Sequence, residues 1–204
     1  MFSLVQGIYE ELTYVNERKI ALLGVESSGK SSILEWLKVY LKKNAPAEAI
    51  VEKPSSLEKM NPTVGLNVAK LHTAGEKLLV WDLGGAKALR SIWERYVEDA
   101  EVVIWVVDSA DESKLEDSRD ELKKLVVREH LVHSPLLIFA NKQDQKDAID
   151  PVKISLDLDL LSDAEKRPQC VQPCSAESGE GIREGIQWLM ANLQGNMKLE
   201  IRIP

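Results

Sequence analysis

The sequence has little cysteine and no long apolar run. Its 204 residues include only two cysteines, Cys170 and Cys174, too few for a disulfide framework or a cysteine-rich zinc site. We expect both to be reduced, as in the cytosol. No stretch approaches the roughly 18 apolar residues of a membrane-spanning helix, and the first twenty positions lack the basic start and apolar segment of a secretory signal. A protein that stays on the cytosolic side is therefore expected.

Basic charge is also in short supply. The chain has 26 Lys and Arg against 33 Asp and Glu, a net charge of −7. Proteins that bind nucleic acid normally carry a basic field, so DNA and RNA are not expected as partners. A hydrophobic share of 44% and a charged share of 29% are ordinary for a globular protein. The length suits one medium-sized domain that buries its core without disulfides or structural metal.

The most informative motif is the run from Gly24 to Ser31, which fits the phosphate-binding pattern G-x-x-x-x-G-K-[ST]. An apolar stretch precedes it and an amphipathic one follows, which makes a chance glycine-rich loop the weaker alternative. We expect Lys30 to reach the β- and γ-phosphates and the Ser31 hydroxyl to bind Mg²⁺. The residues predicted to hold the phosphates are Gly24, Glu26, Ser27, Ser28, Gly29, Lys30, Ser31 and Ser32.

The order of periodic segments predicts an α/β fold. Apolar runs of strand length lie at residues 20–24, 78–82, 102–108, 136–141 and 170–174. Helical spacing occupies residues 30–43, 88–97, 114–131 and 182–193. Residues 66–73 alternate in polarity and precede a turn, which predicts an antiparallel edge hairpin. Together these segments predict a mostly parallel six-stranded sheet with one antiparallel edge strand and helices on both faces.

The second motif is Asp-Leu-Gly-Gly at residues 82–85. We expect Asp82 to hold Mg²⁺ through water and the Gly85 N–H to meet the γ-phosphate, because glycine leaves that approach open. In isolation the pattern is a common end of a strand. Its position after a phosphate loop favours the functional interpretation.

The third motif, Asn-Lys-Gln-Asp at residues 141–144, ends an apolar strand, where open α/β sheets bind ligands. Guanine presents an N1–H and an exocyclic amine side by side, and the Asp144 carboxylate can accept from both. We expect Asn141 to anchor the loop and the Lys142 stem to lie along the purine. A turn after a strand is the alternative for the tetrapeptide alone.

A weaker signal follows the last predicted strand. Cys174, Ser175 and Ala176 stand where a fifth site element is expected. A backbone N–H near Ala176 could reach guanine O6, because a small residue permits the approach.

Four motifs in this order resemble those of Ras-like small GTPases, and their wording resembles the ADP-ribosylation-factor (Arf/Arl) family. Residues 61–65, Asn-Pro-Thr-Val-Gly, are similar to that family's switch I. Residues 81–85, Trp-Asp-Leu-Gly-Gly, are similar to its switch II, and residues 141–144 also suit it. Residues 1–4 and 183–188 most resemble its ADP-ribosylation-factor-related branch. The resemblance implies the P-loop small-GTPase fold, GTP and GDP as ligands, Mg²⁺ as cofactor and GTP hydrolysis as the reaction.

The resemblance extends over residues 1–193 and assigns further roles. Thr63 would close over Mg²⁺ and the γ-phosphate in the GTP state. Leu66, Trp81 and Tyr96 match the positions of an exposed apolar cluster that effectors bind, although all three could simply pack the hairpin. The implied partners are effector proteins, an exchange factor and a GTPase-activating protein. The implied location is cytoplasmic, peripheral on Golgi or trans-Golgi membranes, with a role in vesicle-mediated transport.

The position after Gly85 departs from the family. There the chain has Ala86, where most relatives carry the glutamine that orients the attacking water. A methyl group cannot hold water in line, so slow intrinsic hydrolysis is expected, with Gly85 and Thr63 left as the other members of the catalytic set. A nearly non-hydrolysing GTP-bound scaffold is the alternative, unless a partner replaces the glutamine. A P-loop kinase is disfavoured, since it needs no guanine-reading Asn141-Lys142-Gln143-Asp144.

The amino terminus departs as well, because Phe2 stands where N-myristoylation requires glycine. The segment 1–16 is expected to form an amphipathic helix that associates peripherally with membranes or packs permanently on the domain. Its apolar positions are Phe2, Val5, Ile8, Tyr9 and Leu12. The GTP-binding domain is expected over residues 17–194, with an insertion at 44–60 before switch I and a tail at 195–204 that offers no prenylatable cysteine.

Overall fold

The computed structural model describes residues 17–41, 52–73, 77–160, 167–193 and 201–202. The amphipathic helix predicted at residues 1–16 lies outside the described residues, as does most of the predicted tail. The strands are β1 (Glu17–Leu23), β2 (Leu66–His72), β3 (Lys77–Leu83), β4 (Val102–Asp108), β5 (Leu136–Asn141), β6 (Gln169–Pro173) and β7 (Ile201–Arg202). The α-helices are α2 (Lys30–Tyr40), α3 (Trp93–Asp99), α4 (Leu115–Val126), α5 (Pro151–Asp157) and α6 (Ile182–Leu193).

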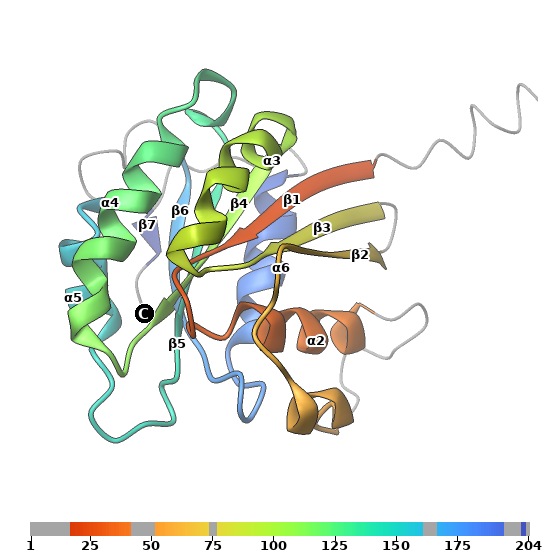
Figure 1. Cartoon of the computed structure of the whole chain (residues 1–204), viewed down its shortest axis with the longest axis vertical. Helices are drawn as coiled ribbons and strands as arrows, with labels where there is room; N and C mark the ends of the chain where they lie inside the picture. The colour runs from red at the N-terminus through yellow and green to blue at the C-terminus, as the bar shows by residue number, and fades with distance from the viewer. Residues whose placement is uncertain (1–16, 42–51, 74–76, 161–166, 194–200, 203–204) are drawn as a thin grey trace, which may run out of the picture.

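The described strands form a single sheet in the order β2-β3-β1-β4-β5-β6-β7, which runs through the centre of the molecule (Figure 1). Neighbours are parallel except β2 and β3, which pair as an antiparallel hairpin with Leu66 opposite Leu83. The predicted α/β fold with one antiparallel edge strand is therefore confirmed. The two-residue β7 extends the six predicted strands at the far edge, and so short a strand shows no period in the sequence.

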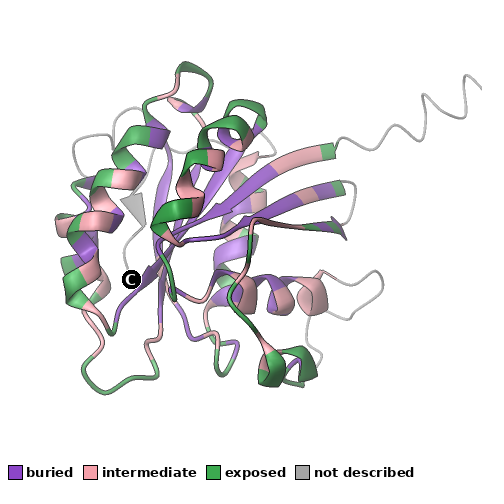
Figure 2. Ribbon diagram, in the orientation of Figure 1, coloured by how far each residue is buried: buried purple, intermediate pink, exposed green. Residues whose placement is uncertain are grey.

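Helices cover both faces of the sheet, so the central strands β4 and β5 are buried along their whole length (Figure 2). Apolar side chains of α3, α4 and α5 pack on one face. Those of α2 and α6 pack on the other. Parallel strands enclosed in this way read as continuous apolar runs, which is why the sequence located β4 and β5 at their observed bounds.

Three predicted helices differ from the structure. The one expected at 88–97 begins as the 3₁₀ helix η2 (Lys87–Ile92) and becomes α-helical only in α3. The one expected at 114–131 is divided into η3 (Glu112–Lys114), α4 and η4 (Glu129–Leu131), because the backbone of Arg128 is extended at φ −61° and ψ 133°. The first helix, expected to run to residue 43, ends as α2 at Tyr40.

The sequence analysis missed α5. Asp150 caps this helix by accepting a hydrogen bond from the Val152 N–H at 2.7 Å, and Pro151 occupies its first turn. Ile154 carries it onto the core. An N-cap aspartate followed by proline is a recognised start signal, so the pair Asp150-Pro151 could have revealed it.

Other described segments refine the sequence analysis. Part of the irregular insertion expected at 44–60 forms the 3₁₀ helix η1 (Ser55–Lys59). Cys170 and Cys174 are buried free thiols, as predicted. None of the described helices has the length and apolar character needed to cross a membrane.

Candidate nucleotide site

The loop between β1 and α2 depends on two glycines with positive φ, Gly24 at 145° and Gly29 at 93°. A Cβ on Gly24 would lie 2.3 Å from the Val106 carbonyl oxygen, and one on Gly29 would lie 2.2 Å from Asn141 Nδ2. Both contacts are far closer than atoms tolerate. The loop therefore requires glycine at both ends for backbone conformation and for space.

Lys30 begins α2 and turns its ammonium group back into this loop. Its Nζ donates to the Val25 carbonyl at 2.9 Å and to Ser28 Oγ at 3.5 Å, and the residue is only 6% exposed. Burial lowers the pKa of Lys30 from 10.5 to about 8, while the nearby Asp82 opposes that shift. A buried cation at a helix N-terminus is a strong site for an anion such as phosphate.

Three oxygen donors predicted to serve Mg²⁺ meet at one point. Ser31 Oγ donates to Asp82 Oδ2 at 2.6 Å and shares a hydrogen bond with Thr63 Oγ1 at 2.7 Å. Asp82 is fully buried, and burial raises its pKa. Its Oδ1 has no hydrogen-bond partner among the described residues.

This donor set fits Mg²⁺, which prefers oxygen ligands and is usually held by one or two carboxylates together with substrate phosphates. No group of three His, Cys, Asp or Glu side chains converges in the described part of the chain, so the protein offers no separate metal cage. Ser31, Thr63 and Asp82 are the residues that would hold the ion.

Gly85 lies against the phosphate loop. A Cβ built on it would come within 2.6 Å of both Lys30 Nζ and the Val25 carbonyl carbon. The predicted close approach of this backbone to the phosphate site is therefore present. Ala86 follows with an extended backbone and lines the same cavity, where its methyl group is the whole side chain.

Asn141 links two loops of the site. Its Nδ2 donates to the Ser28 carbonyl at 2.7 Å, and its Oδ1 accepts from the Ala176 N–H at 2.9 Å. The residue is 1% exposed. Its predicted anchoring position is thus occupied by two definite hydrogen bonds, whereas the contact of the Ala176 N–H with guanine O6 stays a prediction.

The remaining base-reading residues are held by short polar contacts. Ser175 Oγ donates to Asp144 Oδ1 at 2.5 Å and lowers the pKa of that carboxyl group, so Asp144 remains an acceptor at neutral pH. Lys142 adopts a positive φ of 69°, and its Nζ lies 2.6 Å from Oδ2 of the buried Asp108. The ion pair fixes the direction of the Lys142 stem beside the cavity.

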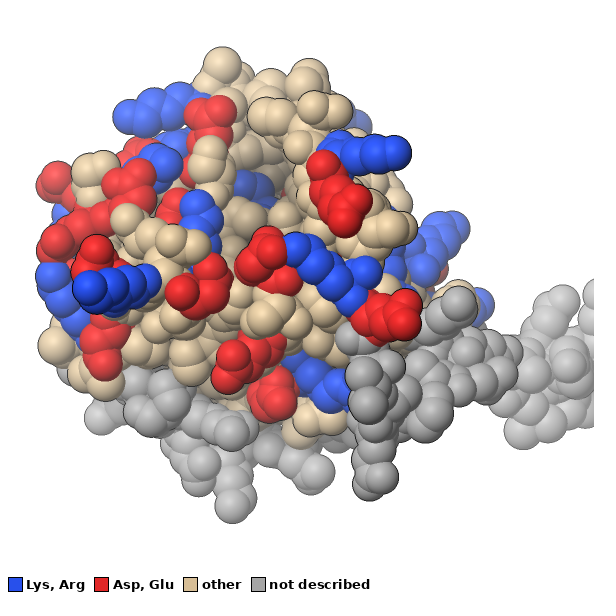
Figure 3. Space-filling model, turned by 90° about the horizontal axis from the view of Figure 1, so that it is seen from below, with Lys and Arg blue, Asp and Glu red and all other residues tan. Residues whose placement is uncertain are grey.

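A cavity of about 350 Å³ opens between these loops. The predicted residues that line it are Glu26, Ser27, Gly29, Lys30, Ser31, Ser32, Thr63, Gly85, Ala86 and Lys142. Gly24, Ser28, Asp82 and Asn141 are buried behind its wall. Asp144, Cys174 and Ser175 line a neighbouring cavity of about 340 Å³. Seen from below, Lys and Arg alternate with Asp and Glu around a hollow (Figure 3).

Sequence analysis missed three residues that support the site. Trp36 Nε1 donates to the Ala176 carbonyl at 2.9 Å, and Tyr40 Oη donates to the Gly179 carbonyl at 2.9 Å. Met60 completes the cavity wall and accepts from Ser32 Oγ at 3.4 Å. Their apolar character alone indicated core packing, and only the tertiary contacts reveal the polar ends.

The predicted effector cluster needs a correction. Trp81 is only 8% exposed, because it packs edge-on against Tyr96 of α3, at 5.3 Å between ring centroids, and joins the core. Leu66 and Tyr96 are half-buried. The exposed apolar side chains beside them are Val64 at 88% and Val68 at 48%, which the sequence did not single out.

Comparison with known proteins agrees with this geometry. A model of the ADP-ribosylation factor family matches residues 5–193. Human ADP-ribosylation factor-related protein 1 is 36% identical over 192 residues, which cover 93% of this chain and 92% of the relative. ADP-ribosylation factor-like protein 3 of Saccharomyces cerevisiae is 34% identical over 200 residues, 97% of this chain and 96% of the relative.

A solved structure gives the same result. The Arl6 BBS3 small GTPase of Trypanosoma brucei, with bound nucleotide analogue GppNp, superposes with a TM-score of 0.73 at 27% identity. The match covers 89% of this chain and all of that one. The chain therefore belongs to the ADP-ribosylation factor family of small GTPases, whose members bind GTP and hydrolyse it to GDP.

Proposed function

We propose that this protein is a GTP-dependent switch that recruits effector proteins to Golgi or trans-Golgi membranes in vesicle transport, with slow intrinsic hydrolysis. The observation that carries the proposal is the convergence of two separate segments on the phosphate loop. Thr63 lies beside Ser31, and Gly85 lies against Lys30. Segments that can meet the γ-phosphate and separate without it are the basis of a nucleotide switch.

Each side chain has a distinct task in this function. Lys30 and the loop amides bind the β- and γ-phosphates, while Asp144 accepts from the guanine N1–H and amine. Ser31, Thr63 and Asp82 hold Mg²⁺, which neutralises phosphate charge when it is bound. The Gly85 N–H then meets the γ-phosphate from the opposite side.

Slow hydrolysis follows from Ala86. Its methyl group lines the cavity where a hydrogen-bonding side chain is needed to orient water. Single-turnover hydrolysis of GTP by the wild type, Ala86→Gln and Ala88→Gln tests this. Ala88 is the matched control, since it is exposed on η2 and outside the cavity lining. We expect Ala86→Gln to raise the rate roughly 10- to 100-fold and Ala88→Gln to leave it unchanged. Equal rates in all three would contradict the role given to Ala86.

The same substitution favours a second function, a scaffold that stays GTP-bound and is turned off by exchange or degradation. The nucleotide content of the freshly purified protein distinguishes the two. Mainly GTP after hours at 25 °C would favour the scaffold, whereas mainly GDP would favour the switch. Bound adenine nucleotide would contradict the assignment of Asp144 in both.

Effector binding and location rest on the resemblance and on surface chemistry. Exposed Val64 and Val68 flank the half-buried Leu66 and Tyr96, which suits a partner that buries apolar surface. We expect an exchange factor and a GTPase-activating protein as further partners. Liposome flotation with GDP and with a GTP analogue tests membrane association, and identical partitioning in both would oppose nucleotide-driven release.

A further inference from the structure

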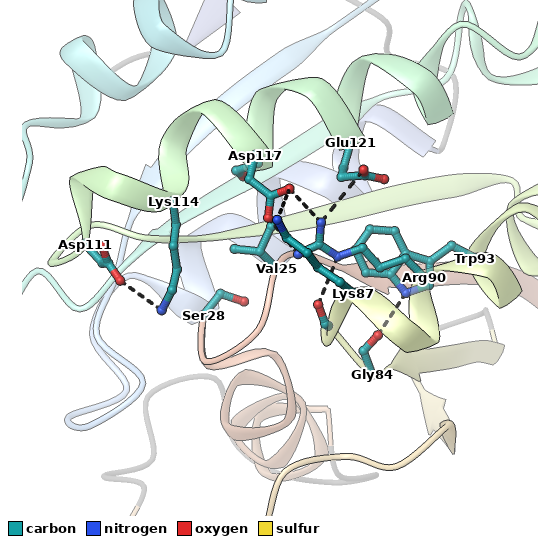
Figure 4. Close-up of polar contacts among 12 residues, drawn as sticks. Val25, Ser28, Gly84, Lys87, Arg90, Trp93, Asp111, Lys114, Asp117 and Glu121 are labelled. Atoms are coloured by element: carbon teal, nitrogen blue, oxygen red, sulfur yellow. Dashed lines mark hydrogen bonds and ion pairs between the residues drawn. The ribbon is translucent and has the colours of Figure 1, made fainter.

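Two consecutive carbonyl groups of switch II are held by side chains that follow them in the chain (Figure 4). Trp93 Nε1 donates to the Gly84 carbonyl at 3.0 Å, and Arg90 Nε donates to the Gly85 carbonyl at 3.1 Å. Both glycines are buried and offer only their backbone. These two bonds therefore fix the orientation of successive peptide groups at the cavity edge.

The first bond controls the group expected to meet the γ-phosphate. The Gly84 carbonyl and the Gly85 N–H belong to one planar trans peptide, so they point in opposite directions. Holding the carbonyl through Trp93 sets the direction of the N–H. Gly85 itself borders the cavity and lies against Lys30.

Arg90 is in turn clamped by helix α4. Its Nη1 and Nη2 each lie 2.8 Å from an Asp117 carboxylate oxygen, a bidentate pair, and Glu121 lies 3.8 Å away. The guanidinium stacks over the Trp93 ring at 5.5 Å and its side chain is 10% exposed. A planar fork held at both ends is a rigid support for the carbonyl it contacts.

A second path joins the same helix to Trp93. The Trp93 ring packs edge-on against Trp105, with 5.7 Å between centroids. Trp105 Nε1 donates to Ser118 Oγ of α4 at 2.9 Å, in a fully buried contact. Helix α4 thus supports both side chains that hold switch II.

We propose that Trp93, Arg90 and Asp117 are positioning residues that orient the Gly85 N–H toward the γ-phosphate and so set the preference of this protein for GTP over GDP. The inference rests on the proposed switch function and extends it to helix α4. GDP has no γ-phosphate, so its binding does not use the Gly85 N–H. Arg90 is committed to Asp117 and Gly85, so it acts through the backbone rather than on the phosphate.

The test compares dissociation constants for a non-hydrolysable GTP analogue and for GDP. Arg90→Lys loses the fork, Asp117→Asn loses the charge, and Trp93→Phe loses the indole donor. In each, we expect the constant for the analogue to rise about tenfold or more and that for GDP to change less than threefold. Asp117→Glu, which keeps a carboxylate, should recover most of the preference.

Lys87→Gln is the matched control, because Lys87 approaches the same Asp117 at 3.9 Å but is 80% exposed and makes no bond to Gly85. It should leave both constants unchanged. An unaltered ratio in Arg90→Lys and Asp117→Asn would overturn the proposal. So would an equal loss of both nucleotides, which indicates a role in the fold alone. A wild-type protein that binds neither nucleotide would instead refute the switch function itself.

Discussion

Removing the Asn141 side chain should destabilise the protein even without nucleotide. Asn141→Ala deletes the hydrogen bonds to the Ser28 carbonyl at 2.7 Å and from the Ala176 N–H at 2.9 Å. Both partners belong to different loops, and Asn141 is 1% exposed, so water cannot readily replace it. A buried polar group left without a partner costs about 1–3 kcal/mol.

Two such groups lower the free energy of unfolding by about 2–4 kcal/mol, which for a domain of this size lowers the melting temperature by roughly 4–16 °C. The assay is urea unfolding of nucleotide-free protein in EDTA. Gln143→Ala is the control, because this side chain of the same loop makes one partly buried bond to the Ile149 carbonyl at 3.1 Å. Its expected cost is about 1 kcal/mol.

The result also separates two roles for Asn141. A side chain that served only to contact the base would leave the nucleotide-free protein as stable as the wild type. Unchanged unfolding of Asn141→Ala in EDTA would therefore refute the bridging role, whatever happens to nucleotide affinity.

Three further outcomes are expected. Because burial lowers the pKa of Lys30 to about 8, the unfolded chain holds the extra proton between pH 8 and 10.5, so the free energy of unfolding of nucleotide-free protein should rise by about 3 kcal/mol across that window relative to Lys30→Met. Parallel pH profiles of the two proteins would contradict this. Gly85→Ala would force a methyl group to 2.6 Å from Lys30 Nζ and should abolish binding of a GTP analogue in titration calorimetry; normal affinity would disprove the close approach. Asp150→Ala removes the cap bond to Val152 and should cost about 1 kcal/mol in thermal unfolding, with nucleotide affinity unaffected.

Segments with a strong local signal were predictable. The continuous apolar runs of β4 and β5 and the regular spacing of α6 gave their bounds because burial on both faces, or on one helical face, leaves a direct trace in residue order. The division of the α4 region was not predictable in this way. It depends on the extended backbone at Arg128, which no periodic pattern records.

The site shows the same distinction. The phosphate loop, Asp82 and the base-reading tetrapeptide were found because each requires particular residue types at fixed spacing. Trp36 and Trp93 were taken as core residues, and both are indeed buried, yet their indole nitrogens hold the Ala176 and Gly84 carbonyls. A buried tryptophan looks the same in sequence whether or not its N–H finds a partner at the site.

The sequence by itself determined the type of fold, the phosphate loop with its requirement for glycine, the guanine-reading residues and the absence of a water-orienting side chain at Ala86. Each of these depends on neighbours in the chain. The tertiary structure alone decided that Thr63 and Asp82 meet Ser31, that Trp81 is buried, and that Asp117 supports switch II through Arg90. Those contacts join residues distant in sequence, and their geometry is set only when the parallel strands bring their carboxyl ends together.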